Sequence, residues 1–284
     1  MEQDGAGEES GVIMQLSISN IAWEKDEEPG IAELLVRLGV TAVDVAPGKY
    51  FPDVAAASDA YIRKVRNWWN ERGITIYGMQ SLLFGTKGLN VFGERDSQDR
   101  LLQHLRHVCR VAEGLGATRL VFGSPRNRDR TGLTDEDAQD IALDFFSRLG
   151  GIAKYWGVVI TLEPNPVCYG TNWITTTRDA YIFVKELRNP SIAMQLDTGT
   201  ILTNDESISA IHSFSDVVGH VHLSEPGLLP LSIAPSVHGP VFQAAANYAP
   251  ETVTIEMLTR GHGNAAELVE SSVRRVQELL QEEQ

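Results

Sequence analysis

The sequence has few cysteines, no long apolar segment and no excess of basic residues. Its two cysteines, Cys109 and Cys168, are too few for a disulfide framework, and neither belongs to a paired metal-binding spacing. This usage fits a reducing compartment, so we expect the protein to be cytoplasmic. No stretch approaches the ~18 uninterrupted apolar residues that a membrane span requires. We therefore expect no membrane partner.

Basic residues are outnumbered, with 24 Lys and Arg against 38 Asp and Glu, for a formal net charge of −14. Nucleic-acid binding draws most of its affinity from clustered basic side chains, so we expect no nucleic-acid partner. Residues 1–11 are acidic and glycine-rich, unlike a secretory signal. We interpret them as a flexible acidic tail, followed by one catalytic domain over residues 12–284.

Short apolar, β-branched segments alternate along the chain with longer segments of helical period. Strands are predicted at 12–19, 42–46, 74–79, 119–122, 158–162, 192–196, 217–221 and 252–255. Helices are predicted at 31–38, 57–72, 97–115, 134–155 and 264–280. Gly73 stands where a helix C-cap belongs, and Thr134 where an N-cap belongs. Eight βα units without a linker predict a single (β/α)8 TIM barrel of the α/β class; a doubly wound open sheet is the alternative.

Active sites of such barrels lie where the strands end and the βα loops begin. Four consecutive late strands end on a possible metal ligand, namely Glu163, Asp197, His222 and Glu256. Any one carboxylate there could simply cap the following helix, but together they would converge and repel one another. The pattern therefore predicts one divalent cation, Mn²⁺ or Mg²⁺ before Co²⁺ or Zn²⁺, with positions left open for substrate oxygens.

The segments that contain these residues resemble those of the xylose-isomerase-like superfamily of sugar isomerases and epimerases, across the whole barrel. They read Leu-Glu-Pro-Asn at 162–165, Leu-Asp-Thr-Gly at 196–199, His-Val-His-Leu-Ser-Glu at 220–225 and Ile-Glu at 255–256. The resemblance implies that Glu163, Asp197, His222 and Glu256 bind one metal ion. It also implies that Glu163 and Glu256 are the catalytic residues, which exchange protons with the substrate.

Two positions depart from the family pattern. The family often has Asp-x-x-His, whose histidine helps to hold substrate, whereas this chain has Thr200 there. The sugar 3-epimerases carry an arginine shortly after the histidine motif, where this chain reads Glu-Pro-Gly-Leu-Leu from Glu225. We therefore expect a different substrate orientation and favour a free ketohexose less. His220 shares its strand with His222 one layer deeper, and we interpret it as structural.

Other residues near the strand ends are candidates for substrate binding. Trp23 and Phe84 follow early strands and could exclude water, while Gln80 could reach a substrate hydroxyl. Asn165, in the Leu-Glu-Pro-Asn motif, and His238, in the last long loop, are further candidates. The alternative for these residues is ordinary loop packing.

A basic cluster stands out against the acidic background in the loop after the fourth strand. Arg126 and Arg128, with Arg130 beside them, could bind a substrate carboxylate or phosphate. The alternative is that these arginines are solvated or paired with neighbouring acids such as Asp129 and Asp135.

The sequence predicts a metal-dependent isomerase or epimerase of a small sugar-like substrate, which acts by proton transfer through an enediolate. A keto-polyol dehydratase is the nearest alternative, because an enediolate can expel a β-hydroxyl. An abasic-site endonuclease is less favoured, since Gln80, Ser124 and Thr200 stand where its extra zinc ligands belong. A non-catalytic sugar-binding barrel is the remaining class. Substrate identity, phosphorylation, metal preference and assembly into a homo-oligomer stay open.

Overall fold

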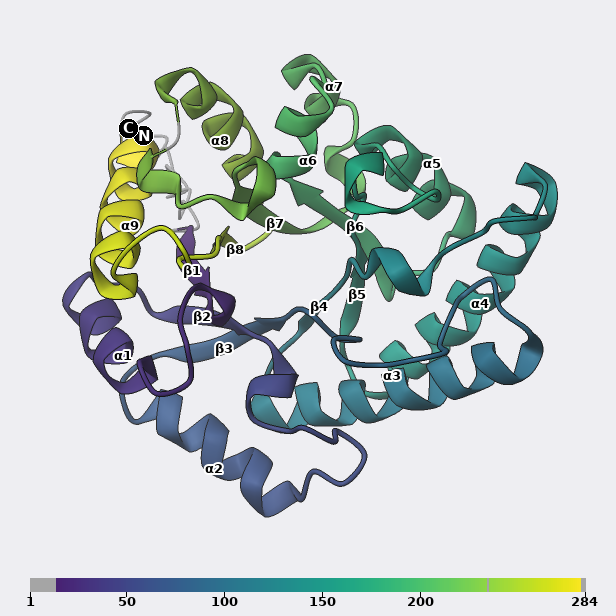
Figure 1. The fold of residues 1–284 in the computed structure, drawn as a ribbon, viewed down its shortest axis with the longest axis horizontal. Helices are drawn as coiled ribbons and strands as arrows, with labels where there is room; N and C mark the ends of the chain where they lie inside the picture. The colour runs from purple at the N-terminus through teal and green to yellow at the C-terminus, as the bar shows by residue number, and fades with distance from the viewer. Residues whose placement is uncertain (1–13, 234, 282–284) are drawn as a thin grey trace, which may run out of the picture.

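Eight parallel strands close into a barrel in the order β1 to β8, with β8 pairing back to β1, and helices surround them (Figure 1). The computed structural model describes residues 14–233 and 235–281. The strands are β1 Gln15–Ser19, β2 Ala42–Val45, β3 Thr75–Met79, β4 Arg119–Phe122, β5 Val159–Leu162, β6 Ile192–Asp197, β7 Val218–Ser224 and β8 Thr252–Glu256. The predicted TIM barrel is thus confirmed, and the open sheet is wrong. The predicted acidic tail lies outside the described residues.

Helices follow the strands around the outside of the barrel. They are α1 Glu28–Arg37, α2 Asp59–Asn70, α3 Arg95–Leu115, α4 Asp135–Tyr155, α5 Thr177–Leu187, α6 Thr198–Thr203, α7 Ile208–His212, α8 Gly239–Ala246 and α9 Ala265–Gln281. Short 3-10 helices lie in the loops at η1 Asn20–Ala22, η2 Pro47–Lys49, η3 Pro125–Asn127, η4 Val167–Tyr169, η5 Ser215–Val217, η6 Pro226–Leu228, η7 Leu231–Ile233 and η8 Ser236–His238. No helix in the described part of the chain is long and apolar enough to cross a membrane.

The helix ends are set by local chemistry that the sequence already contains. The Thr134 side chain caps α4 by accepting a hydrogen bond from the backbone of Asp137 at 3.1 Å. Gly73, which follows α2, has a φ of +73°, a conformation that favours glycine. These two residues mark where α4 begins and where the chain turns after α2.

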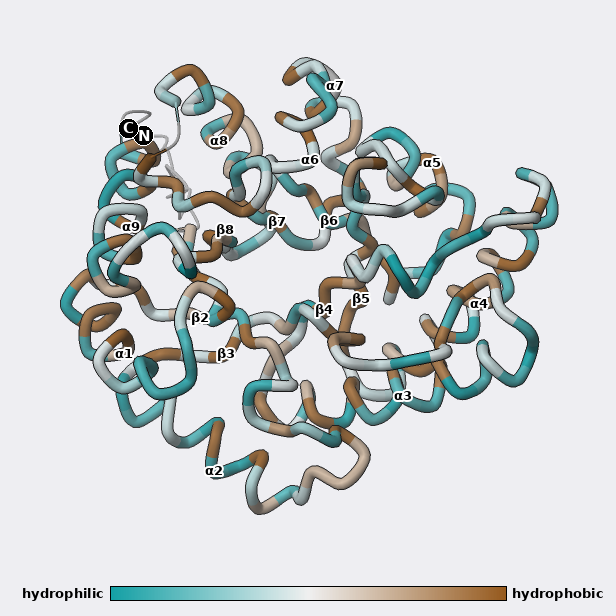
Figure 2. Tube along the Cα trace, in the orientation of Figure 1, coloured by the Kyte–Doolittle hydropathy of each residue, from teal (hydrophilic) through white to brown (hydrophobic). Residues whose placement is uncertain are grey.

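The core lies between the barrel wall and the helices. Leu101, Leu105 and Val108 of α3, spaced four and three residues apart, are fully buried. Hydropathy along the chain follows this arrangement, with apolar residues on the strands and intermittently along the helices (Figure 2). Inside the barrel, by contrast, polar residues such as Asp44 and Gln195 are buried.

Three strands run further than predicted. β6, β7 and β8 extend to Asp197, Ser224 and Glu256, although their apolar runs stop earlier. Backbone pairing continues through these polar residues, with Asp197 opposite His222 and Ser224 opposite Glu256. The strand ends therefore hold the ligand candidates on rigid backbone rather than in loops.

Candidate active site

The four residues predicted from the late strand ends come together at one end of the barrel. Glu163, Asp197, His222 and Glu256 each offer a ligand atom, and these atoms all lie within 4.8 Å of one another. Nδ1 of His222 is 3.3 Å from Oε2 of Glu256 and 3.7 Å from Oε1 of Glu163. Neighbouring strands thus bring three carboxylates together around a single imidazole.

The donor set fits a divalent cation. Both ring nitrogens of His222 are buried, and neither has a hydrogen-bond partner among the described residues; Nδ1 is the one that faces the glutamates. A buried nitrogen without a partner, facing carboxylates that repel one another, is explained if all of them share a cation. Three oxygen donors and one imidazole suit a six-coordinate ion with room for substrate oxygens.

The four residues of the cluster shift one another's pKa values. Burial, and then the negative charges of Glu256 and Asp197, raise the pKa of Glu163 to about 8. Burial and Glu256 also raise the pKa of Asp197. Burial alone would lower the pKa of His222, but the nearby carboxylates outweigh it and hold that pKa well above its usual value. Protons on Glu163 and His222 therefore offset the negative charge where a metal ion would otherwise do so.

Asp197 is held by three neighbouring groups. Ser224 donates its hydroxyl to Oδ1, and the backbone amide of Thr200 donates to Oδ2 at 2.7 Å. The Thr200 hydroxyl lies 2.8 Å from the same oxygen, so Thr200 supports this carboxylate in the place where family members often have a histidine. Gly199 leaves room for this arrangement, because a Cβ atom there would lie 2.7 Å from the Ser224 hydroxyl, which would have to shift.

The two glutamates have amide partners. Gln80 donates to Oε1 of Glu256 at 2.7 Å, and Asn165 donates to Oε2 of Glu163 at 3.0 Å. Arg128 is fully buried and donates to the backbone carbonyl of Glu163 and to Oδ1 of Asn165, both at 2.7 Å. Gln80 and Asn165 thus orient the glutamate side chains directly. Arg128 acts on Glu163 indirectly, through the Glu163 backbone and the Asn165 side chain.

A cavity of about 300 Å³ opens beside the cluster. Its lining includes Glu163, Glu256 and Asn165, together with Tyr169 and Leu228 from the loops after β5 and β7. The volume suits a small molecule. The carboxylates form its polar floor, and the loop residues form an apolar wall.

Glu225 also lines this cavity, and its carboxylate is paired with a histidine. Both oxygens of Glu225 lie 2.9 Å from Nδ1 of His238. Glu225 is buried, whereas the His238 side chain is 22% exposed. The pair is a second ionisable unit at the cavity, outside the four-residue cluster.

The remaining predicted residues do not line the cavity. Trp23 is buried in the core, whereas Phe84 is 88% exposed. Arg126 is exposed, Arg128 is buried, and Arg130 forms a 2.6 Å ion pair with Asp135. The three arginines therefore do not form one anion-binding surface. Arg128 is unavailable to an anion, because its guanidinium is committed to the protein interior.

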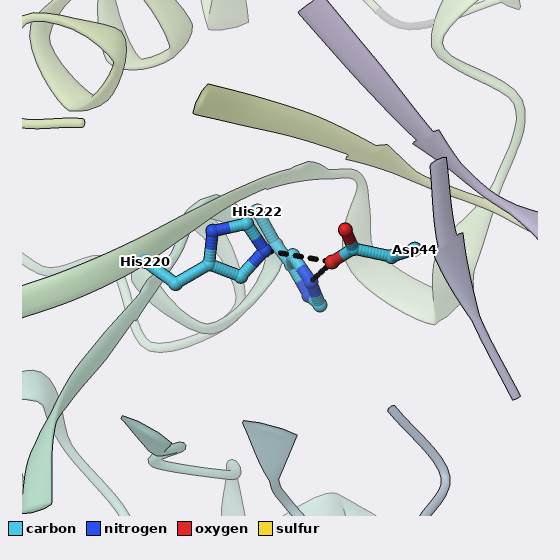
Figure 3. A group of neighbouring side chains, drawn as sticks. All are labelled: Asp44, His220 and His222. Atoms are coloured by element: carbon cyan, nitrogen blue, oxygen red, sulfur yellow. Dashed lines mark hydrogen bonds and ion pairs between the residues drawn. The ribbon is translucent and has the colours of Figure 1, made fainter. Parts of the chain in front are cut away.

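Sequence reasoning missed Asp44. It lies on β2, where its Oδ2 atom is 2.7 Å from Nε2 of His220 and 3.5 Å from Nε2 of His222 (Figure 3). All three side chains are fully buried. Burial would raise the pKa of Asp44, but the two histidines outweigh it and hold that pKa well below its usual value. The available signal was a lone charge in an otherwise apolar strand, Ala-Val-Asp-Val at 42–45.

Comparison with solved structures shows the same fold in sugar epimerases. The chain is similar to a 3-keto-D-glucoside 4-epimerase from E. coli, at 15% identity and a TM-score of 0.74, over 93% of this chain and 99% of that one. It is similar to an L-ribulose 3-epimerase at 15% identity and a TM-score of 0.77, over 95% of each chain.

A third similar structure is the protein IolI, solved with a bound zinc atom, at 14% identity and a TM-score of 0.71, over 95% of this chain and 99% of that one. A search of curated proteins found no match. The family model described as xylose isomerase-like TIM barrel matches residues 32–281. Together with the closed barrel, this match shows that the chain belongs to the xylose isomerase-like TIM barrel family.

Proposed function

We propose that this protein is a metal-dependent isomerase or epimerase of a small sugar or sugar phosphate, and so an enzyme of carbohydrate metabolism. The observation that carries the proposal is that Glu163 and Glu256 line the same cavity, each within 3.7 Å of the His222 imidazole. Epimerases of keto sugars among the structures of the same fold support it. A protein that only bound sugar would have no need for two such glutamates.

Glu163, Asp197, His222 and Glu256 would hold one divalent cation. Mn²⁺ or Mg²⁺ suits this oxygen-rich set best, and Co²⁺ or Zn²⁺ is the alternative. When bound, the cation supplies Lewis-acid stabilisation of the negative charge that develops on a substrate oxygen. The protein itself provides the rigid placement of the ligands on β6, β7 and β8.

The two glutamates would carry out the proton transfers. One removes the proton from the carbon next to the substrate carbonyl, which gives an enediolate. If the other returns a proton to the opposite face, the product is an epimer; if the proton goes to the adjacent carbon, it is an aldose–ketose isomer. Gln80 and Asn165 fix the orientation of Glu256 and Glu163, and Asn165, which lines the cavity, is the amide that would bind a substrate hydroxyl.

The remaining substrate contacts are assigned by position. Asn165 lines the cavity, and Arg126 follows Pro125, which also lines it. Arg126 is exposed, and we propose that it contacts a substrate carboxylate or phosphate. His238 acts through Glu225. Trp23 packs in the core and Phe84 is exposed, so neither is assigned a substrate contact.

A keto-polyol dehydratase is the second candidate, and the Glu225–His238 pair favours it. Expulsion of a β-hydroxyl from an enediolate needs a general acid, and Glu225 is a carboxyl group at the cavity with a histidine 2.9 Å away. Both reactions share the first proton abstraction. They differ in whether water is lost afterwards.

The experiment that tests the proposal follows proton exchange. The protein is loaded with Mn²⁺, or with Mg²⁺ for direct NMR detection, and incubated in D₂O with ketoses, keto-polyols and their phosphates. We expect loss of the proton next to the carbonyl for one substrate class, followed by an epimer, an isomer or a dehydrated product. No exchange with any of these compounds in the metal-loaded protein would overturn the proposal.

A further inference from the structure

We propose that Asp44 is a positioning residue for the metal ligand His222, because its carboxylate, 3.5 Å from Nε2, keeps the ring proton on that nitrogen and so leaves the Nδ1 lone pair free for the cation. The inference rests on the proposed metal site. The two ring nitrogens face different partners. Nδ1 faces Glu256 and Glu163, whereas Nε2 is 3.5 Å from Oδ2 of Asp44. A neutral imidazole carries its proton on one nitrogen only, so the group that binds that proton decides which nitrogen can bind a metal.

The barrel interior encloses the Asp44 carboxylate completely. A buried carboxylate is unfavourable unless it is paired, and Asp44 is fully buried inside the barrel. Gly78 lies directly opposite Asp44 on β3, and a Cβ atom there would lie 2.6 Å from both carboxylate oxygens. Any other residue at position 78 would displace Asp44. The absence of a side chain at Gly78 therefore leaves space for the Asp44 carboxylate next to the two histidines.

His220 holds Asp44 in place. Its Nε2 atom lies 2.7 Å from Oδ2, and the Thr254 hydroxyl lies 3.3 Å from the same nitrogen. Oδ1 of Asp44 has the Ser17 hydroxyl at 3.5 Å. Both histidines thus approach one carboxylate oxygen, as the dashed lines in Figure 3 show. His220 would therefore act on the cation site indirectly, by holding the Asp44 carboxylate next to His222.

Asp44, His220 and His222 also offer ligand atoms close enough together to hold a cation of their own. One feature argues against that alternative. Oδ2 of Asp44 and Nε2 of His220 lie 2.7 Å apart, at hydrogen-bond distance, so these two atoms are already paired with each other. The same geometry is accounted for if Asp44, hydrogen-bonded to His220, acts through its charge on Nε2 of the ligand His222, 3.5 Å away.

The test compares Asp44→Asn with the wild-type full-length chain by Mn²⁺ calorimetry. Loss of such a partner typically weakens metal affinity by about 10–100-fold, and we expect a loss in this range. Asp96→Asn, on the surface of α3 with an 82% exposed side chain, is the matched control and should bind as the wild type does. His222→Ala should weaken binding further, because it removes the ligand itself.

A spectroscopic readout separates positioning from a merely structural role. In the Zn²⁺-loaded protein, imidazole ¹⁵N NMR should show His222 protonated at Nε2, with a downfield proton that moves upfield in Asp44→Asn. This variant also loses the charge that pairs with His220, so we expect its metal-free melting temperature to fall, and Mn²⁺ affinities are compared at a temperature where both proteins are folded. Should Asp44→Asn fail to fold, Gly78→Ala keeps the carboxylate but displaces it and should also weaken Mn²⁺ binding.

The possible failures are distinguishable. Wild-type Mn²⁺ affinity in a folded Asp44→Asn variant would overturn the role of Asp44 and leave the metal site standing. A metal-loaded His222 that is protonated at Nδ1 would overturn the assignment of its ligand atom. Failure of the wild-type protein to bind any divalent cation would overturn the proposed function, and this inference with it.

Discussion

Gln80 donates a hydrogen bond of 2.7 Å to Oε1 of Glu256, which joins the ends of β3 and β8. Oε2 of the same carboxylate is then left facing Nδ1 of His222 at 3.3 Å. Burial would raise the pKa of Glu256, but His222 outweighs it, so this pKa is lowered, whereas that of Glu163 is raised to about 8. The two glutamates are therefore chemically unequal before any metal or substrate binds.

This inequality leads to the first prediction. Glu163→Gln and Glu256→Gln should each keep the fold and lower kcat by about 10²–10⁴-fold, because an amide offers an oxygen ligand but cannot act as a base. If the glutamates serve opposite faces, one variant should still exchange the substrate proton with D₂O without completing the reaction. Steady-state kinetics and NMR exchange on each variant measure this. Near-normal turnover in both would mean that the base is another group, such as Glu225.

The second prediction concerns pH. Glu163, with a pKa of about 8, is largely protonated at neutral pH in the metal-free protein, and a cation must displace that proton. Metal affinity should therefore rise as the pH approaches 8, by up to about tenfold per pH unit for each proton released. Calorimetry in buffers of different ionisation enthalpy counts the protons. Binding that is independent of pH between 6 and 8 would contradict the charge assignment.

The same shift has a consequence for stability. A carboxyl group whose folded pKa is raised binds its proton more tightly in the folded than in the unfolded state. We expect Glu163 to contribute fully to the free energy of unfolding below its ordinary pKa of 4.5. This contribution should be lost as the pH rises to its folded pKa of about 8. Melting curves of the metal-free protein over this window, compared with Glu163→Gln, measure this contribution. Added Mn²⁺ should reverse the loss.

The third prediction tests the space around Glu163. A Cβ atom at Gly123 would lie closer than 3.0 Å to Oε2 of Glu163, so Gly123→Ala must push that carboxylate aside. We expect weaker Mn²⁺ binding and a loss of about 1–3 kcal/mol in the free energy of unfolding. Gly151→Ala is the control, because it is exposed on α4 with open space around it. Equal behaviour of the two variants would argue against a crowded Glu163.

The fourth prediction separates this chain from nucleases with the same fold. Cleavage of DNA at abasic sites should be absent even with added Zn²⁺. Gln80 is bound to Glu256, and Thr200 to Asp197, so neither is available to build a multinuclear zinc cluster. A gel assay with an abasic oligonucleotide measures this. Efficient cleavage that is lost in His222→Ala would assign the site to hydrolysis instead of isomerisation.

Much of this protein is determined by local sequence. Alternating apolar and helical segments predicted the barrel, because each strand must be buried on both faces and each helix on one. The position of Glu163, Asp197, His222 and Glu256 after apolar runs predicted their convergence, because parallel strands all end at the same rim. Both predictions follow from the order of residues along the chain, without any knowledge of interatomic distances.

Only the tertiary structure decided which residues support that cluster. Asp44 and His220 are 176 residues apart, and no local pattern links them, yet closure of the barrel places them 2.7 Å from each other. Likewise, the spacing of Arg126 and Arg128 suggested a shared anion site, whereas the loop after β4 buries one and exposes the other. The order and approximate position of the strands follow from apolar periodicity along the sequence. Loop side chains and buried polar partners depend on long-range packing, which periodicity does not record.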